Sequence, residues 1–240
     1  MGLRFQRKKG RNLTASFLYG IFRLLFFLKP GEKLKLFLNL SWIFTRLAHE
    51  QSYKSNVRIS NDHRFDFLLK HIKGTDKILD LGCGQGRLIT EIRKVTPHIT
   101  GVDLDKKNLE IAETKNKNGA IRFIHNDIIN YITAIHDKGF DVAILSHVIE
   151  HLEDPENALR ILRNKVARLY IEVPDFESAT LNLFRAELKL DLSYEDADHI
   201  YEFDRFDIQA LLEKSGLEIF DADYRFGCIR VWVRTRPDLQ

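Results

Sequence analysis

The stretch LDLGCGQG, which runs from Leu79 to Gly86, decides the fold of this chain. An apolar, strand-like run leads into it, and three glycines then alternate with other residues before a helix-like segment begins near Arg87. Glycine lets the chain turn sharply and lets its backbone approach a ligand closely. The free N–H groups at the start of the helix favour an anionic group. The stretch therefore predicts a ligand-binding turn between a strand and a helix.

The glycine spacing separates this turn from two other nucleotide-binding turns. Nicotinamide and flavin enzymes use G-x-G-x-x-G. Counted from Gly82, the sixth position here is Arg87, which breaks that spacing. The lysine of a phosphate-binding P-loop is absent as well. By itself, the turn leaves the identity of the ligand open.

Short apolar runs alternate with helical segments on both sides of the turn, which is typical of βαβ units and a parallel sheet. A helix near Phe206–Ser215 is followed by two further strand-like runs with a short connection, which predicts a closing antiparallel hairpin. The fold class that we predict is α/β: a Rossmann-like, doubly wound, mostly parallel seven-stranded sheet with an antiparallel last strand, plus N-terminal helices. The predicted strands are Lys77–Leu81, Ile99–Asp103, Ile121–His125, Asp141–Leu145, Ala167–Val173, Leu217–Tyr224 and Gly227–Arg234.

Two acidic residues follow the second and third predicted strands. Asp103 ends the second strand in GVDLD, 23 residues after Asp80, where its two oxygens are placed to accept both hydroxyls of a ribose. Asp127, in IHNDI, is placed to accept a hydrogen bond from the exocyclic amine of adenine. Helix capping and strand-end solvation remain alternatives for both acids. Because ligands of open α/β sheets bind at the carboxyl edge, these acids point to an adenosine-type ligand.

With FDVAILSHVIEHLEDP at Phe140–Pro155, these motifs resemble the class I S-adenosylmethionine-dependent methyltransferases of the small-molecule type. They are similar to ubiquinone-biosynthesis O-methyltransferases, over roughly Asp76–Arg234. The resemblance implies an S-adenosylmethionine cofactor, with Asp80 and the glycines at its methionine part, Asp103 at the ribose and Asp127 with Ile128 at the adenine. It places Ser146 where the loop after the fourth strand passes the sulfonium. The cofactor-binding residues predicted in this way are Asp80, Gly82, Cys83, Gly84, Gln85, Gly86, Asp103, Leu104, Asp127, Ile128 and Ser146.

The histidines in the loop after the fourth predicted strand could have several roles. His147, Glu150 and His151 form H-x-x-E-H, formally an inverted zinc-protease motif, but its place in a nucleoside-binding pattern argues against a protease. Ubiquinone-type O-methyltransferases carry an E-x-x-E-H here that is associated with a divalent metal. His147 replaces the first glutamate, so we expect no metal ligand set, and a bound divalent metal stays open as the alternative. Glu150 and His151 are expected to form a hydrogen-bonded pair that supports the loop.

Two histidines are candidate catalytic residues. His147 follows the strand directly and is the first candidate for a base that accepts a hydroxyl proton. His199, in DADHIYEFDR, is the second, with a lid contact or a structural role as alternatives. His199 belongs to residues 174–203, an insertion that we expect to form a substrate lid, because loops at this edge commonly select the substrate.

The N-terminal region has a different composition from the rest of the chain. Residues 12–52 are rich in Phe and Leu with interleaved basic residues, and Pro30–Gly31 divides them into two predicted helices. Two alternatives stay open: a peripheral contact with a membrane surface, or a helical cap packed on the domain or on a second subunit. The apolar run of Phe17–Leu28 is interrupted by Arg23 and is too short to span a bilayer. We therefore predict residues 1–55 as a basic and apolar helical hairpin, and 56–240 as the methyltransferase domain.

The composition sets the remaining expectations. The net charge of +3 is small, and two cysteines make no disulfide framework, so we expect a cytoplasmic protein that can also associate with a membrane. The predicted function is methyl transfer to a hydroxyl, or secondarily an amine, of a small-molecule, glycan or lipid-linked acceptor. A nucleic-acid methyltransferase and a non-catalytic adenosine-binding module are the alternatives. We expect no nucleic-acid partner, because Ser146-His147-Val148 replaces the Asn/Asp-Pro-Pro-aromatic turn of base-methylating enzymes. The sequence leaves the oligomeric state open.

Overall fold

The computed structural model describes residues 13–23, 28–54, 64–117, 120–135, 139–190 and 198–236. The chain divides into two compact units. Residues 1–57 and 185–192 form the first unit, and residues 58–184 and 193–240 form the second. The first twelve residues of the predicted hairpin and residues 191–197 of the predicted lid lie outside the described residues. Residues 185–192, which we assigned to the lid, group with the N-terminal helices.

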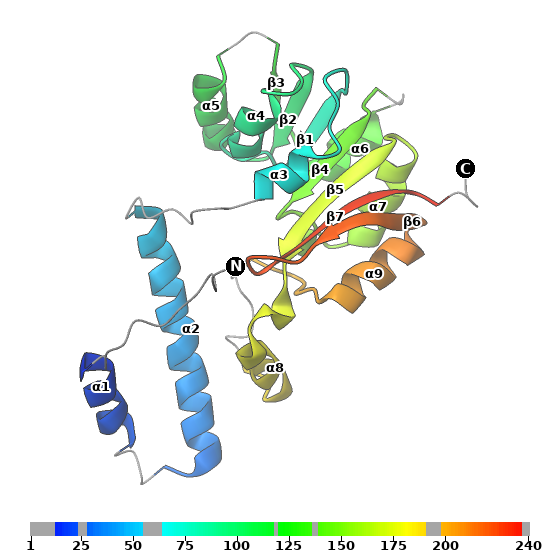
Figure 1. Ribbon diagram of the computed structural model, residues 1–240. Helices are drawn as coiled ribbons and strands as arrows, with labels where there is room; N and C mark the ends of the chain where they lie inside the picture. Colours follow the sequence, from blue (N-terminus) through cyan, green and yellow to red (C-terminus); the bar gives the residue numbers. More distant parts are fainter. Residues whose placement is uncertain are drawn as a thin grey trace, which may run out of the picture. The chain divides into compact units, whose positions relative to one another are not determined.

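The second unit is built on a seven-stranded sheet with the order β3-β2-β1-β4-β5-β7-β6 (Figure 1). Strands β1 to β5 pair in parallel, and β7 pairs antiparallel with both β5 and β6. The predicted fold class is therefore confirmed, including the antiparallel end. The strands are β1 (Ile78–Leu81), β2 (Ile99–Asp103), β3 (Arg122–His125), β4 (Val142–Ser146), β5 (Arg168–Pro174), β6 (Leu217–Asp223) and β7 (Cys228–Thr235).

The strand order reverses direction between β1 and β4. The chain proceeds outward from β1 through β2 to β3 and then returns to the other side of β1 to form β4. Loops that leave neighbouring strands on opposite faces open a crevice at such a reversal, where ligands of this architecture bind. The glycine turn after β1 and the loop after β4 both lie at this point.

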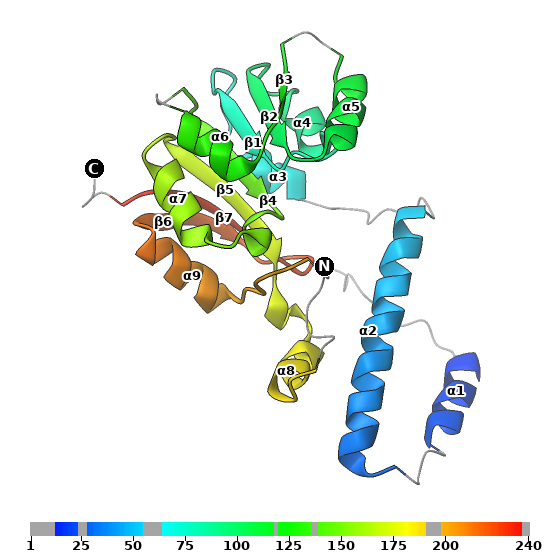
Figure 2. The same ribbon diagram turned by 180° about the vertical axis from the view of Figure 1, so that it is seen from behind.

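Helices cover both faces of the sheet, as Figures 1 and 2 show. Side chains alternate between the two faces along each strand. Leu79 packs in the apolar core with the residues of α6, α7 and α9, whereas Ile78 packs in the core that includes residues of α3, α4 and α5. The elements of the two layers are α3 (Arg64–Leu69), α4 (Arg87–Ile92), α5 (Lys106–Lys115), α6 (Ile128–Ala134), α7 (Pro155–Arg163) and α9 (Arg205–Lys214), with the 3-10 turns η1 (Ile149–His151) and η2 (Phe176–Ser178).

The first unit consists of α1 (Leu13–Arg23), α2 (Pro30–Lys54) and the segment 185–192, which begins within α8 (Thr180–Glu187). Proline stands at the first position of α2, where its missing N–H costs no helical hydrogen bond. Leu38 is buried, and the Arg185 guanidinium donates through Nη2 to the Leu38 carbonyl at 3.2 Å and to Ser41 Oγ at 3.3 Å. The rings of Phe22 and Phe37 meet edge to face with centroids 5.9 Å apart.

Neither α1, α2 nor any other helix of the described ranges combines the length and apolarity that a membrane crossing requires.

Candidate functional site

The glycine turn is held in shape by backbone hydrogen bonds to β2. The N–H groups of Gly82 and Cys83 both donate to the Val102 carbonyl, at 2.8 and 3.1 Å. Gly82 has φ +71°, and a Cβ there would lie 2.7 Å from Cγ2 of Val148, so the turn needs glycine for two reasons. Gly84 has φ +51°, and a Cβ there would meet no atom within 4 Å. The middle of the turn therefore borders open space that a ligand can fill.

Asp103 stands at the end of β2 beside this open space. Its Oδ2 accepts a hydrogen bond from Gly84 N at 2.7 Å, and its Oδ1 accepts one from Asp105 N at 2.8 Å. Each carboxylate oxygen has further lone-pair directions, so both remain able to accept hydrogen bonds from two adjacent hydroxyls. The bond to Gly84 also fixes the carboxylate against the glycine turn, which joins the predicted ribose and methionine positions into one cradle.

Asp80 lies under the turn and is 2% exposed. Its Oδ2 is buried and has no hydrogen-bond partner among the described residues. Burial, and next the negative charge of Asp103, raises the pKa of Asp80 to about 7. A buried carboxylate without partners is costly unless a donor or a cation meets it. The ammonium group of a bound amino acid would supply both, so Asp80 fits the predicted contact with the methionine part of the cofactor.

The adenine end of the predicted site is formed by loops after β2 and β3. Asp127 is the N-cap of α6, and its Oδ1 accepts from Asn130 N at 2.9 Å. Capping thus occupies one oxygen, and the predicted contact with the adenine amine stays a prediction for the other. Leu104 is exposed, and its carbonyl is bonded to His125 Nε2 at 2.9 Å, which fixes the loop beside the predicted adenine position. Ile128 begins α6 and lies against the larger core.

The remaining predicted cofactor contacts differ in how their side chains are placed. Cys83 is buried, and burial raises the pKa of its thiol, so it faces the protein interior and contributes its backbone to the turn. Gln85 is exposed and bonds to Asn108 and Lys115 of α5. Gly86 is the N-cap of α4 with φ +71°. Ser146, the last residue of β4, donates to Glu172 Oε2 at 3.2 Å.

A row of paired charges crosses the sheet next to Ser146. Glu172 is opposite Ser146 on β4 and opposite Arg230 on β7, and Arg230 is in turn opposite Asp223 on β6. Arg230 Nε donates to Glu172 Oε1 at 3.0 Å, and its Nη1 donates to Asp223 Oδ2 at 3.3 Å. Tyr170 donates its hydroxyl to Glu172 Oε2 at 3.0 Å. We call Ser146, Glu172, Arg230 and Asp223 the charged row; its members satisfy one another inside the sheet.

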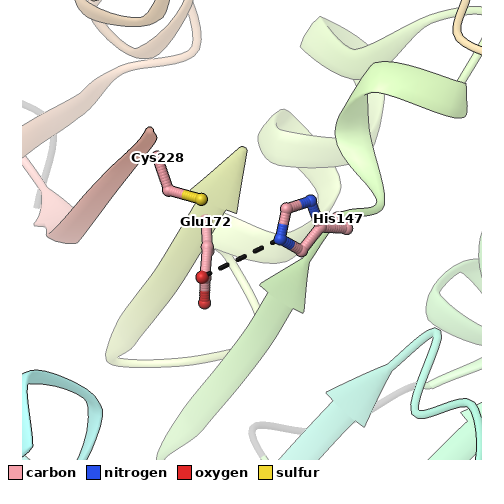
Figure 3. Close-up of side chains that lie close together, drawn as sticks. All are labelled: His147, Glu172 and Cys228. Carbon is pink, nitrogen blue, oxygen red and sulfur yellow. Dashed lines mark ion pairs between the residues drawn. The ribbon is translucent and has the colours of Figure 1, made fainter. Parts of the chain in front are cut away.

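His147 meets the charged row from the loop after β4 (Figure 3). Its Nε2 lies 3.8 Å from Glu172 Oε1 and its Nδ1 lies 3.3 Å from Glu150 Oε1, while Cys228 at the start of β7 completes the group in Figure 3. Partial burial lowers the pKa of His147, but its contact with Cys228 and the negative charges of Glu150 and Glu172 outweigh this and raise it to about 10. At neutral pH the ring therefore holds its proton, and a role as proton acceptor stays a prediction.

His199 lies in a second group with Glu150 and His151. One ligand-type atom of each of these three residues lies within 4.8 Å of the others. The Glu150 carboxylate thus has three imidazoles near it, those of His147, His151 and His199. His147 groups with Glu172 and Cys228, whereas Glu150 and His151 group with His199. The expected hydrogen bond between the Glu150 and His151 side chains is absent, because both Glu150 oxygens lack a hydrogen-bond partner among the described residues.

Two residues of this region escaped the sequence analysis. Glu172 and Arg230 are 0% and 2% exposed and anchor the charged row. The available signal was a charge within the apolar part of each of two strands, Glu172 in RLYIEVP and Arg230 in CIRVWVRT; each strand also carries an arginine near one end. A charge on an apolar strand indicates a buried partner, but the partner's identity depends on which strands pair.

The fold defines the class of protein: a seven-stranded sheet of this order, with the ligand cradle after β1 and β2, is the architecture of class I S-adenosylmethionine-dependent methyltransferases. The family model described as "Methyltransferase domain" matches residues 53–222, most of the chain. The chain therefore belongs to this methyltransferase family. The family's cofactor is S-adenosylmethionine, and the geometry of Asp80, Gly84 and Asp103 fits it.

Among curated proteins, the chain is 36% identical over 104 residues to an uncharacterized methyltransferase of Mycobacterium bovis. The matched segment covers 43% of this chain and 51% of that protein. It is 28% identical over 123 residues to a ubiquinone biosynthesis O-methyltransferase of Chromobacterium violaceum, covering 49% and 53%. The chain thus spans about half the length of the curated relatives that it matches.

Solved structures share the fold at low sequence identity. An S-adenosylmethionine-dependent methyltransferase from Clostridium acetobutylicum superposes with a TM-score of 0.56 at 16% identity, covering 81% of this chain and 99% of that one. A SAM dependent methyltransferase from Archaeoglobus fulgidus gives a TM-score of 0.54 at 20% identity, covering 72% and 91%.

Proposed function

We propose that the protein transfers a methyl group from S-adenosylmethionine to a hydroxyl oxygen of a small-molecule or lipid-linked acceptor. The observation that carries the proposal is the cradle after β1 and β2. Asp103 offers two oxygens beside the open space at Gly84, and Asp80 offers a buried carboxylate oxygen without a partner among the described residues. This combination suits a ligand that carries a ribose and an ammonium group, and a plain dinucleotide has no group for Asp80.

The reaction makes modest demands on the protein. When bound, the cofactor would supply a methyl group on a sulfonium, with the neutral thioether as the leaving group, and the acceptor hydroxyl would give up its proton to water. Acceleration then comes largely from holding the acceptor oxygen in line with the methyl group. The loop after β4, with Ser146 and His147, lies at the strand-order reversal, and we propose that the alignment occurs there.

Two observations favour an oxygen acceptor over a nucleic-acid base. The curated relatives include ubiquinone biosynthesis O-methyltransferases, which supports hydroxyl chemistry for this chain. The loop after β4 reads Ser146-His147-Val148 and lacks the proline and aromatic residues that grip a base amine. A glycan acceptor shares the same hydroxyl chemistry.

Transfer of labelled methyl tests the proposal. The purified chain is incubated with methyl-labelled S-adenosylmethionine and a cell extract, which is then separated into small-molecule, lipid, protein and RNA fractions. We expect label in the small-molecule or lipid fraction, and none with Asp103→Ala. Label in RNA alone would overturn the acceptor class. Cofactor binding without transfer into any fraction would favour a non-catalytic binding module.

We further propose that the first unit contacts an anionic membrane surface. Large apolar side chains on α1 and α2 are exposed, among them Phe17 at 69%, Tyr19 at 69% and Phe44 at 61%. Basic residues accompany them, namely Arg23, Lys29, Lys33 and Lys35, against one acid, Glu32, over residues 17–35. Apolar side chains enter the acyl boundary while lysines meet anionic headgroups, so charge complementarity favours lipid over a second copy of this basic surface.

Flotation with lipid vesicles tests whether this surface binds a membrane or a second copy of the chain. We expect the full chain to float with phosphatidylglycerol vesicles and to float less with phosphatidylcholine. Phe17→Gln with Phe44→Gln should reduce flotation severalfold, whereas Phe206→Gln, an equally exposed phenylalanine on α9 of the second unit, should not. Unchanged flotation of the double variant would contradict the proposal. So would a dimer in sedimentation that the double variant dissociates.

A further inference from the structure

The carboxylate of Glu150 lies in an unusual environment. The residue is 1% exposed, and neither side-chain oxygen has a hydrogen-bond partner among the described residues. The ring of His147 approaches Oε1 at 3.3 Å as an ion pair, without forming a hydrogen bond. A buried carboxylate normally accepts several hydrogen bonds, because leaving its oxygens unsatisfied costs free energy. An additional group that takes lone pairs from these oxygens would remove that cost.

Two imidazoles face the same carboxylate. His151 stands next to Glu150 in η1, and His199 comes from the segment that precedes α9. Their rings meet edge to face with centroids 4.8 Å apart, and one ligand-type atom from each lies within 4.8 Å of the others and of a Glu150 oxygen. Residues far apart in the chain therefore direct two nitrogens and one oxygen to a common point.

Each imidazole is oriented by an outer hydrogen-bond acceptor. Nδ1 of His199 lies 2.9 Å from Glu202 Oε1, and both side chains are less than a tenth exposed. Nδ1 of His151 lies 3.2 Å from the Asp198 carbonyl. Nδ1 is the protonated nitrogen in each ring, because only a donor can meet these oxygens. In the neutral ring this arrangement leaves the lone pair on Nε2, a tautomer that metal-binding histidines adopt.

The protein backbone holds the two contributing segments together. The N–H groups of Ile200 and Tyr201 donate to the Glu150 carbonyl, at 2.8 and 3.1 Å. His199 is thus fixed beside η1 by its neighbours, independently of any ligand. A site whose members are already assembled loses less conformational entropy when it binds.

We propose that Glu150, His151 and His199 form a binding site for a divalent metal ion of the zinc class. Two imidazole nitrogens with one carboxylate suit Zn²⁺, whereas Mg²⁺ requires mainly oxygen ligands. Ligand atoms around a tetrahedral zinc ion are about 3.4 Å apart, so small side-chain rotations close the set observed here. Three protein ligands leave a fourth position open. This site differs from the E-x-x-E-H set, because the third ligand comes from His199 and His147 belongs to the neighbouring group.

Metal titration tests the site without depending on methyl transfer. The full chain is stripped with a chelator, and Zn²⁺ binding is followed by calorimetry, with Co²⁺ absorption as a reporter of tetrahedral geometry. We expect one ion per chain and an intense visible Co²⁺ spectrum. His199→Ala and Glu150→Gln should each weaken Zn²⁺ binding at least about 100-fold, and Glu202→Ala about 10-fold by releasing the outer contact. His98→Ala, an exposed histidine of the same unit, is the matched control and should bind like the parent chain.

The neighbouring cluster provides the decisive comparison. If Cys228→Ser abolishes Zn²⁺ binding and His199→Ala does not, the ion belongs to His147, Glu172 and Cys228 and the proposal fails. Absence of Zn²⁺ and Co²⁺ binding to the parent chain would also overturn it. S-adenosylmethionine affinity is measured in the same samples: retained cofactor binding with lost metal binding separates this inference from the proposed methyl transfer.

Discussion

The cofactor cradle and the charged row solve the problem of buried charge in different ways. In the cradle, Asp103 is satisfied by backbone N–H groups of nearby turns, and Asp80 has a buried oxygen that no described residue satisfies. In the charged row, Arg230 pairs with both Glu172 and Asp223 across three strands. An unpaired buried charge can contribute to ligand affinity, whereas charges that are paired within the sheet contribute to the stability of the fold. Changes in the two regions should accordingly affect different measurements.

Arg230→Met should have the largest effect, and it should appear in stability. It leaves the Glu172 and Asp223 carboxylates without their shared cation, which costs about 3–5 kcal/mol of unfolding free energy. Denaturant unfolding measures this cost. Arg234→Met is the matched control on the same strand; its guanidinium is half-exposed beside Glu218, and its loss should cost less than about 1 kcal/mol. Equal losses in the two variants would show that the charged row has no special structural role.

Asp103→Ala should have the next largest effect, and it should appear in cofactor affinity. Loss of two hydrogen bonds from a charged group should weaken S-adenosylmethionine binding about 100-fold or more in calorimetry. Its neighbour Asp105 caps α5, so Asp105→Ala should lower stability by about 1 kcal/mol and leave affinity nearly unchanged. The assignment of binding to the cradle and of stability to the charged row would be wrong if Asp103→Ala unfolded the protein and Arg230→Met weakened cofactor binding instead.

The protonation of Asp80 should make cofactor binding depend on pH. Its pKa of about 7 means that the carboxyl is neutral below that pH, so pairing with an ammonium group requires loss of a proton. Affinity should therefore rise about 20-fold between pH 5.5 and 7.5. The empty protein should show the reverse trend, because a folded pKa above the ordinary value of 3.8 removes stability as the pH rises between these values. Asp80→Asn should flatten both profiles; a pH dependence that survives this change would assign it to another group.

Asp127 should give the smallest effect and decides between two roles. Asparagine also caps helices, so Asp127→Asn should keep α6 and the stability of the fold. If the second oxygen accepts a hydrogen bond from the adenine amine, as predicted, cofactor affinity should fall about 3- to 10-fold, since the single amide oxygen caps α6 and the N–H₂ group then faces the amine. Affinity equal to that of the parent chain would assign Asp127 to capping alone.

The two regions were also predictable from the sequence to different degrees. The cradle is encoded by residues close together in the chain, and the alternation of apolar runs gave the parallel strands to within a residue or two. Glu172 and Arg230 are 58 residues apart, and their pairing follows from the insertion of β7 between β5 and β6. Local patterns do not determine strand order. For the same reason the contact of Arg185 with α2 and the grouping of His199 with Glu150 could not be anticipated.

The charged row has a consequence for how the chain folds. Strand β7 is the last strand in the sequence, and it has to pair with β5 although other strands of the sheet are also apolar. A slip of one residue would turn every β7 side chain to the opposite face and place Arg230 against hydrocarbon. Apolar packing tolerates approximate alignments, but a buried guanidinium does not. Pairing of Arg230 with Glu172 thus favours one register of the closing hairpin over registers shifted by one residue.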